Sequence, residues 1–312
     1  MKKLKKNKKK KKLINKTILV VGGSGFIGYH LIKFFLNKNW RVYSLSLNYP
    51  KKFRKLKKVI YFKGDIAELN QIVFLHKLKV DYVINCGGYV DHSNKKRSYK
   101  SHVIGCKNLV KIFIKKKIRT FIQIGSSAEY GAAKSPQSEN SKTITFGSYG
   151  KNKLTATKFL QNLKTFFPYI IIRPYQIYGP YQDNNRLIPF IINSCIEDKK
   201  FPCTNGVQFR DFLYIDDFIN SIFKCLDSKK SYKEIFNIGL GKPITIREVI
   251  IKIRKKIKSG DPQFGKILMR NFEQKKVYPS IKKALRYINW KPKVNLDKGL
   301  DKTIKFYKSL KN

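Results

Sequence analysis

The sequence predicts an α/β fold in which a doubly wound parallel sheet is followed by a smaller, discontinuous α/β domain. Short apolar runs rich in β-branched residues recur over about the first 175 residues, as expected of strands buried on both faces of a sheet. Amphipathic stretches of helix length separate most of these runs. Strands that alternate with helices form parallel sheets of this kind, whose ligands bind beyond the carboxyl ends of the strands.

The elements of the first domain follow in order along the chain. The first strand is expected at residues 17–21, where TILVV ends in glycines, and the first helix follows at residues 26–37. Further apolar runs predict strands at residues 41–45, 59–62, 82–85, 120–124 and 169–172. The stretches between them predict helices at residues 68–77, 102–116 and 151–165.

Beyond Tyr178 the alternation gives way to loops that contain Pro, Asn and Gly. Helices are expected there at residues 188–197 and 246–257, and strand-like runs that can return to the sheet lie at residues 211–215 and 235–238. The opening block of lysines predicts a basic disordered tail over residues 1–16, because like charges repel. After the tail we expect two domains. The first consists of residues 17–180 together with about 208–240, and the second consists of residues 181–207 and 241–312.

Composition excludes several classes of protein. The formal net charge is +49, from 68 Lys and Arg against 19 Asp and Glu, yet 42% of the residues are hydrophobic, as in a chain with a packed core. Lysines occur in every segment without a zinc-finger, RNA-recognition or helix-turn-helix motif, so we expect no specific nucleic-acid partner. No apolar run reaches the roughly 18 residues of a membrane span, which predicts a cytoplasmic protein without membrane insertion. The five cysteines include no CxxC pair, which predicts buried thiols and no metal site.

The motif GGSGFIG at residues 22–28 lies between the first expected strand and the first expected helix. Glycines at positions 22, 25 and 28 allow a tight turn, a close approach of the backbone to a pyrophosphate, and close packing of the helix on the sheet. The helix N-terminus adds oriented N–H donors. The alternative is a glycine turn without a ligand, but the flanking strand and helix favour a dinucleotide and hence a Rossmann-type domain.

Two further motifs point to proton transfer. The motif YGKNK at residues 149–153 is expected at the start of a helix, where residues four apart share a face. The Lys153 ammonium can then lie near the Tyr149 phenol and favour its ionised form. The motif GSSAEYG at residues 125–131 directly follows the strand expected at residues 120–124, so its hydroxyls fall at the edge where such a sheet binds substrate.

These motifs resemble those of the extended short-chain dehydrogenase/reductases, specifically the branch of nucleotide-sugar epimerases, dehydratases and reductases. The resemblance covers nearly the whole chain after the tail. Its remaining elements are GDI at residues 64–66, NCGG at 85–88, RPYQIYGP at 173–180, RDFLYIDD at 210–217, FNIG at 236–239 and WKP at 290–292. The resemblance implies a homodimeric enzyme that acts on a nucleoside-diphosphate sugar in the synthesis of surface-polysaccharide precursors.

The resemblance also implies roles for individual residues. Tyr149 would be the general acid/base, Lys153 would hold the nicotinamide ribose, and Ser127, chosen over Ser126 by counting back from Ala128, would bind the reacting sugar oxygen. The implied coenzyme-binding set is Gly22, Gly25, Phe26, Ile27, Gly28, Ser46, Asp65, Ile66 and Lys153. The implied substrate-binding set is Ser127, Glu129, Tyr149, Arg210 and Arg270. Arginine suits a diphosphate because its planar fork binds two oxygens at once, although Arg210 could instead form an ion pair with Asp211.

The end of the second strand departs from the NAD-selective members of this family. Those members place an acid there, which accepts a hydrogen bond from the ribose 2′-hydroxyl and would repel a 2′-phosphate. Ser46 stands at that position, followed closely by Lys51, Lys52 and Arg54. This favours NADP(H) over NAD as the coenzyme.

The reaction class depends on the residues after the catalytic hydroxyl. Sugar 4,6-dehydratases of this family resemble one another in an Asp-Glu pair there, whereas this chain has Ala128 and Glu129, which disfavours dehydration. The expected reaction is hydride exchange at C4 of the sugar, as the reduction of a 4-keto-6-deoxy sugar. A 4-epimerase with tightly bound NAD would use the same three side chains, and a 4,6-dehydratase is the second alternative. A non-catalytic Rossmann protein that binds polyanions is the alternative of a different class.

Overall fold

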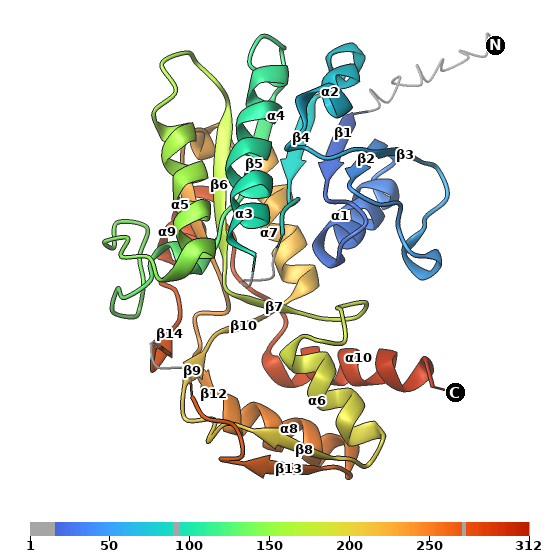
Figure 1. Cartoon of the computed structure of the whole chain (residues 1–312), viewed down its shortest axis with the longest axis vertical. Coiled ribbons are helices and arrows are strands. Elements are labelled where there is room, and N and C mark those ends of the chain that lie inside the picture. The colour runs from blue at the N-terminus through green and yellow to red at the C-terminus, as the bar shows by residue number, and fades with distance from the viewer. Residues whose placement is uncertain (1–15, 90–93, 270–272, 312) are drawn as a thin grey trace, which may run out of the picture.

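A computed structural model of the chain describes residues 16–89, 94–269 and 273–311. Seven parallel strands form its main sheet in the order β11-β6-β5-β4-β1-β2-β3, with helices on both faces (Figure 1). The strand order reverses between β1 and β4, which is the place where ligands bind in open sheets of this kind. The predicted fold class, a Rossmann-type doubly wound sheet, is confirmed.

The strands of the main sheet are β1 (Thr17–Val21), β2 (Arg41–Ser46), β3 (Val59–Lys63), β4 (Tyr82–Asn85), β5 (Thr120–Ile124), β6 (Tyr169–Pro174) and β11 (Ile235–Ile238). The helices are α1 (Phe26–Asn37), α2 (Leu69–Ile72), α3 (Lys95–Tyr99), α4 (Gly105–Phe113), α5 (Gly147–Gln161), α6 (Leu187–Ile196), α7 (Ile215–Asp227), α8 (Ile246–Ile257), α9 (Lys282–Ile288) and α10 (Leu296–Ser309).

Alternation along β1 divides the core into two layers. Ile18 and Val20 belong to the cluster that includes α1 and α7, whereas Leu19 and Val21 belong to the cluster that includes α4 and α5. Successive side chains of a strand point to opposite faces, so a strand that is covered on both faces is apolar at most positions. The run TILVV is therefore the sequence of a central strand.

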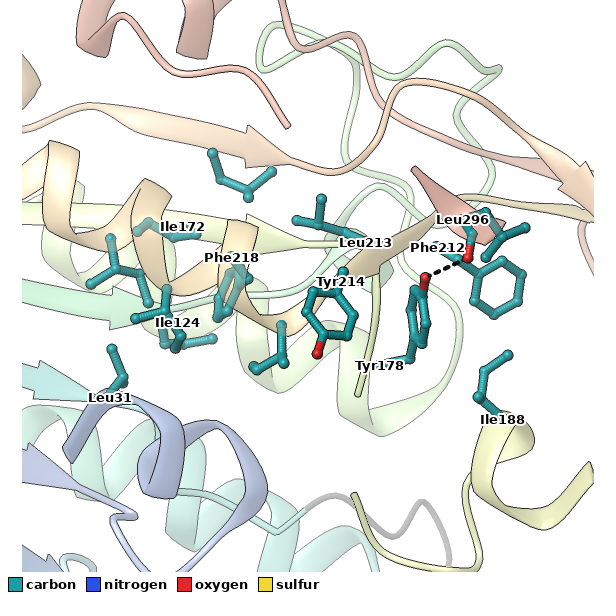
Figure 2. Packing of buried hydrophobic residues seen from close by; sticks show 14 of the residues in the cluster. Leu31, Ile124, Ile172, Tyr178, Ile188, Phe212, Leu213, Tyr214, Phe218 and Leu296 are labelled. Carbon is teal, nitrogen blue, oxygen red and sulfur yellow. Dashed lines mark hydrogen bonds between the residues drawn. The ribbon is translucent and has the colours of Figure 1, made fainter. Parts of the chain in front are cut away.

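The second half of the chain adds three small sheets. They pair β7 (Gln176–Tyr178) with β10 (Phe212–Tyr214), β8 (Lys200–Cys203) with β13 (Asp261–Phe264), and β9 (Phe209–Arg210) with β12 (Ile244–Thr245) and β14 (Lys276–Val277). These sheets lie with α6, α8 and α10 beyond one end of the main sheet (Figure 1). The α1-side cluster continues into this region without a break, and Figure 2 shows Tyr178 donating a hydrogen bond of 3.2 Å to the Leu296 carbonyl within it.

Several expected elements differ from the observed ones. The run at 211–215 does not return to the main sheet, because β10 pairs with β7, whereas the run at 235–238 does return as β11. The helix expected at 68–77 shortens to α2, followed by a 3₁₀ segment, Val73–Lys77. The helix expected at 102–116 starts instead after a π-helical turn, and the one expected at 151–165 begins earlier, at Gly147. The expected tail lies almost entirely outside the described residues, and the domain boundaries stay a prediction.

Candidate active site

The glycine turn connects β1 to α1 without room for a side chain at Gly22 or Gly28. Gly22 has a left-handed backbone with φ of +80°, and a Cβ there would lie 2.7 Å from the backbone nitrogen of Gly87. A Cβ on Gly28 would overlap the carbonyl oxygen of Gly22, so α1 approaches the turn only because residue 28 is glycine. Phe26 and Ile27 open α1, where their N–H groups lack intrahelical acceptors. The turn is thus a backbone cradle of the kind that fits a pyrophosphate.

A cavity of about 310 Å³ opens at the carboxyl ends of β1, β2, β3 and β4. Its lining includes five of the predicted coenzyme residues: Gly22, Gly25, Ser46, Asp65 and Ile66. The Ser46 hydroxyl accepts a hydrogen bond of 3.1 Å from the N–H of Ser24, which leaves its own O–H able to donate. The Asp65 carboxylate accepts from the Ala67 N–H at 2.8 Å. A cavity at the strand-order reversal beside a glycine cradle fits a dinucleotide.

Tyr149 and Lys153 lie one turn apart on α5. The Lys153 ammonium is 5.9 Å from the centroid of the Tyr149 ring, and it donates a hydrogen bond of 2.8 Å to the carbonyl of Ile124 at the end of β5. The Lys153 side chain is 5% exposed, so its charge is held in place rather than solvated. The expected proximity of ammonium and phenol is present.

Ser127 begins a short 3₁₀ helix, η4 (Ser127–Glu129), which packs against the first turns of α5. The neighbouring Ser126 is its N-cap and accepts a hydrogen bond from the Ala128 N–H at 3.1 Å. A Cβ on Gly150 would lie 2.6 Å from the Ala128 carbonyl, so α5 comes this close only because residue 150 is glycine. The Ser126 hydroxyl is therefore used to build the turn, whereas that of Ser127 makes no hydrogen bond to the described residues.

The role expected for Glu129 in substrate binding stays a prediction, and the surroundings of this residue argue against it. Its side chain is 0% exposed, and its carboxylate accepts hydrogen bonds of 2.8–2.9 Å from the Ser126 N–H, the Thr157 hydroxyl and the Arg173 guanidinium. Both carboxylate oxygens are occupied, and Arg173 is itself buried. Glu129 is a structural anchor that joins η4 to α5 and β6.

Arg210 lies on the wall of a second cavity, of about 470 Å³, which α6, α8 and β8 also line. Its guanidinium donates to the carbonyls of Phe209 and Gln274, and it forms an ion pair with Glu273 rather than with Asp211. Burial lowers the pKa of Arg210, while the Glu273 carboxylate opposes this. The Asp211 carboxylate instead accepts from the backbone of Leu240 and Lys242. The other predicted arginine, Arg270, lies outside the described residues.

Sequence reasoning missed a wall of the dinucleotide cavity. After β4 the lining continues through Gly87, Gly88 and Tyr89, and a helical segment adds Arg97, Lys100 and Ser101. The sequence signal that could have identified this wall is the pair Gly87 and Gly88, which follows the end of β4. Of the three basic residues that closely follow β2, Arg54 is buried and bonded to the carbonyls of Ser24 and Tyr181 and to Asp183, so it is not available to a 2′-phosphate.

In the described part of the chain, no group of three or more His, Cys, Asp or Glu side chains could hold a metal ion. All five cysteines are free, and burial raises the pKa of the Cys86 thiol, which lines the cavity, to about 12. No helix among the described residues is long and apolar enough to cross a membrane.

Known proteins resemble this chain over most of its length. A dTDP-D-glucose 4,6-dehydratase of Dictyostelium discoideum is 31% identical over 268 residues, which are 76% of this chain and 61% of that protein. A dTDP-4-dehydro-6-deoxyglucose reductase of Escherichia coli is 28% identical over 92% of this chain and 96% of its own. The crystal structure of a UDP-glucuronic acid 4-epimerase of Bacillus cereus with UDP-glucuronic acid and NAD has a TM-score of 0.84 and 26% identity, over 94% of this chain and 99% of that one. The NAD dependent epimerase/dehydratase family model matches residues 18–239, from β1 to the end of β11, and the chain therefore belongs to this family of enzymes.

Proposed function

We propose that this protein exchanges a hydride between a nicotinamide dinucleotide and C4 of a nucleoside-diphosphate sugar. One observation carries the proposal: Tyr149 and the buried Lys153 share a face of α5, which packs against the 3₁₀ helix η4 that Ser127 begins, at the same edge of the sheet as the glycine-lined cavity. A general acid/base, a fixed cation and a free hydroxyl are the groups that carbonyl reduction and alcohol oxidation require.

Each of these side chains has one task in the proposal. Tyr149 moves the proton on the C4 oxygen, Lys153 keeps a positive charge beside the phenol, and Ser127 donates a hydrogen bond to the same oxygen. The bound nicotinamide supplies the chemistry of hydride transfer. Gly22, Gly25 and the first N–H groups of α1 would hold its pyrophosphate.

Among the family's reactions, the burial of Glu129 argues against dehydration. Eliminating water across two carbons needs a second acid/base beside the hydroxyl, but Glu129 is paired with Arg173 and Ala128 has no ionisable group. We favour reduction of a 4-keto-6-deoxy sugar. The reductase of Escherichia coli, which is similar to this chain over nearly the full length of both, supports this choice.

For the coenzyme we favour NADPH, because Ser46 supplies a hydroxyl where an acid would repel a 2′-phosphate. Arg54 does not contribute to this preference, since its guanidinium is bonded to Tyr181 and Asp183. The second cavity, with Arg210 in its wall, would take the nucleoside diphosphate once the ion pair of Arg210 with Glu273 opens.

A second candidate is 4-epimerisation with retained NAD, which is supported by the likeness to the UDP-glucuronic acid 4-epimerase. The three side chains would serve this reaction unchanged. A homodimer stays a prediction for either reaction.

The test is to release and identify the nucleotide that copurifies with the protein, and then to assay it with dTDP- and UDP-linked 4-keto and 4-hydroxy sugars. A reductase consumes NADPH stoichiometrically with the keto sugar, and Tyr149→Phe should lower kcat by about 10²–10⁴-fold while coenzyme binding is kept. Retained NAD with interconversion of C4 epimers and no net NADPH use would replace reduction by epimerisation. Tight RNA binding at physiological salt together with full activity of Tyr149→Phe would reject both.

A further inference from the structure

His102 lies between the dinucleotide cavity and Tyr149, and no sequence motif gives it a role. It is the central residue of a π-helical turn (Lys100–Ile104) between α3 and α4, and its side chain is 1% exposed. Single π-helical turns inside helices are uncommon and frequently lie at functional sites.

The imidazole makes two directed contacts. Its Nε2 lies 2.9 Å from the carbonyl oxygen of Tyr89, and because a carbonyl can only accept, Nε2 carries the proton. The ring also packs edge-to-face against Tyr149, with centroids 5.3 Å apart and an interplanar angle of 82°. His102 therefore contacts the cavity wall on one side and the proposed acid/base on the other.

The neighbours of His102 reinforce both contacts. The Ser101 hydroxyl accepts a hydrogen bond of 2.9 Å from the Tyr89 N–H, so consecutive residues of the turn hold both backbone groups of Tyr89. One turn earlier, the Ser98 hydroxyl accepts a hydrogen bond of 3.0 Å from the side chain of Asn152, which precedes Lys153 on α5. The segment is thus fastened to the cavity wall and to α5 together.

The ring is uncharged and closely fitted. Burial, and to a smaller extent the nearby charge of Lys153, lowers the pKa of His102 to about 2. The hydrogen bond to Tyr89 acts in the opposite direction and raises the pKa. Its Nδ1 is buried without a hydrogen-bond partner among the described residues. A Cβ on Gly88 would overlap the ring edge that carries Nδ1, so the imidazole fits only against a glycine.

We propose that His102 is a positioning residue of the hydride-transfer site, which ties the Tyr89 wall of the dinucleotide cavity to the ring of Tyr149. This inference rests on the proposed function, in which Tyr149 moves the proton. A neutral ring suits the task because it fixes the phenol without placing a second cation beside Lys153. Because Nε2 carries the single N–H of the neutral imidazole, the unpartnered Nδ1 is an acceptor and leaves no N–H of the ring unsatisfied.

Two substitutions separate the two contacts. His102→Phe keeps a ring against Tyr149 but removes the donor to Tyr89, so the Kd for NADPH or NADH should rise by about 5–10-fold, the effect of one lost hydrogen bond, with a smaller change in kcat. His102→Gln keeps an N–H donor but removes the ring, so Kd should stay within about twofold while kcat falls about tenfold and its pH profile shifts. Dinucleotide fluorescence titration and pH-dependent kinetics measure these effects.

The matched controls are His76→Phe and His76→Gln, at an exposed histidine of the 3₁₀ segment Val73–Lys77. The inference is overturned if the His102 variants match these controls, or if both lose affinity and kcat in parallel with a common drop in Tm, which marks a purely structural residue. The titration needs no sugar substrate. If the wild type binds the dinucleotide more tightly than His102→Phe but converts no sugar nucleotide, the result therefore counts against the proposed function alone. If the two proteins bind the dinucleotide with equal affinity, the result counts against the positioning role of His102.

Discussion

Glu129 and Glu234 each form an ion pair with a basic side chain, but the two ion pairs contribute differently to folding stability because their surroundings differ. The Glu129 carboxylate is fully buried against the buried Arg173, whereas Glu234 is about one third exposed beside Lys283. A buried pair has lost its hydration, so removing one partner leaves a charge that nothing compensates. An exposed pair is screened by water and contributes little.

Glu129→Gln should therefore destabilise the protein by about 3–5 kcal/mol, because the Arg173 charge stays buried without its counterion. The matched substitution Glu234→Gln should cost no more than about 1 kcal/mol. Urea denaturation followed by circular dichroism measures both. A Glu129→Gln protein with the wild-type denaturation midpoint and a selective loss of turnover would instead make Glu129 a substrate-binding residue, as the sequence predicted.

At the scale of the element, the turn between β1 and α1 contains glycines required for different reasons. Gly28→Ala should cost about 1–3 kcal/mol of folding free energy, because its Cβ would overlap the Gly22 carbonyl oxygen. Gly25 has extended backbone, and a Cβ there would lie 3.3 Å from its nearest neighbour, the Gly22 carbonyl oxygen. Gly25→Ala should thus keep the denaturation midpoint but weaken dinucleotide binding by about tenfold or more, because the methyl group occupies the pyrophosphate approach.

Denaturation and fluorescence titration of the same two proteins check this separation of roles. If Gly25→Ala and Gly28→Ala lower the free energy of unfolding equally, both glycines are required for packing of the turn. Full dinucleotide affinity in Gly25→Ala would exclude the backbone at residue 25 from the pyrophosphate site.

Buried strands were predictable because their burial is encoded locally. The expected ranges of β1, β4, β5 and β11 coincide with the observed ones, since strands that are covered on both faces are apolar at most positions. The π-helical turn before α4 could not be read from the sequence, because the partners of this region come from other parts of the chain: Tyr89 bonds to the turn itself, and Asn152 bonds to Ser98 of α3 just before it.

The candidate site likewise contains residues that local sequence predicts and residues that depend on distant parts of the chain. The glycine turn and the pair of Tyr149 with Lys153 follow from local spacing, and the structure brings each together. Glu129, Arg54 and His102 depend on long-range partners. The ion pair of Glu129, the burial of Arg54 and the contacts of His102 could therefore not be predicted from the sequence.

At the scale of the whole molecule, histidines that are wholly or partly buried connect stability to pH. His30 of α1 hydrogen-bonds through Nε2 to the carbonyl of Pro180, which follows β7, and desolvation of its partly buried ring lowers its pKa from 6.5 to about 4. Between these pH values the unfolded chain binds more protons than the folded one. The contribution of His30 is complete above pH 6.5 and decreases as the pH falls through this window.

The loss by pH 4 should be on the order of 3 kcal/mol for His30, with His102 adding to the same trend. His30→Gln, which keeps a donor for Pro180, should flatten the dependence of unfolding free energy on pH. The exposed His76→Gln should leave it unchanged. Urea denaturation at intervals between pH 7.5 and pH 4.5 gives the slopes, and a His30→Gln protein with the wild-type slope would rule out this histidine as a source of the acid lability.

The surface ion pairs and the net charge of the molecule predict opposite effects of salt on its thermal stability. Surface pairs such as Lys100 with Glu68 and Lys256 with Asp301 are partly or largely exposed, so added salt would weaken them slightly. The formal charge of +49 is a larger effect, because repulsion among the excess cations disfavours the compact state and is screened by the same salt. We therefore expect Tm to rise as NaCl increases from about 10 mM to about 300 mM, by about 2–4 °C for each kcal/mol of repulsion relieved. Scanning calorimetry with sucrose at matched osmolality separates screening from osmotic stabilisation, and a Tm that falls with NaCl would mean that the ion pairs outweigh the net charge.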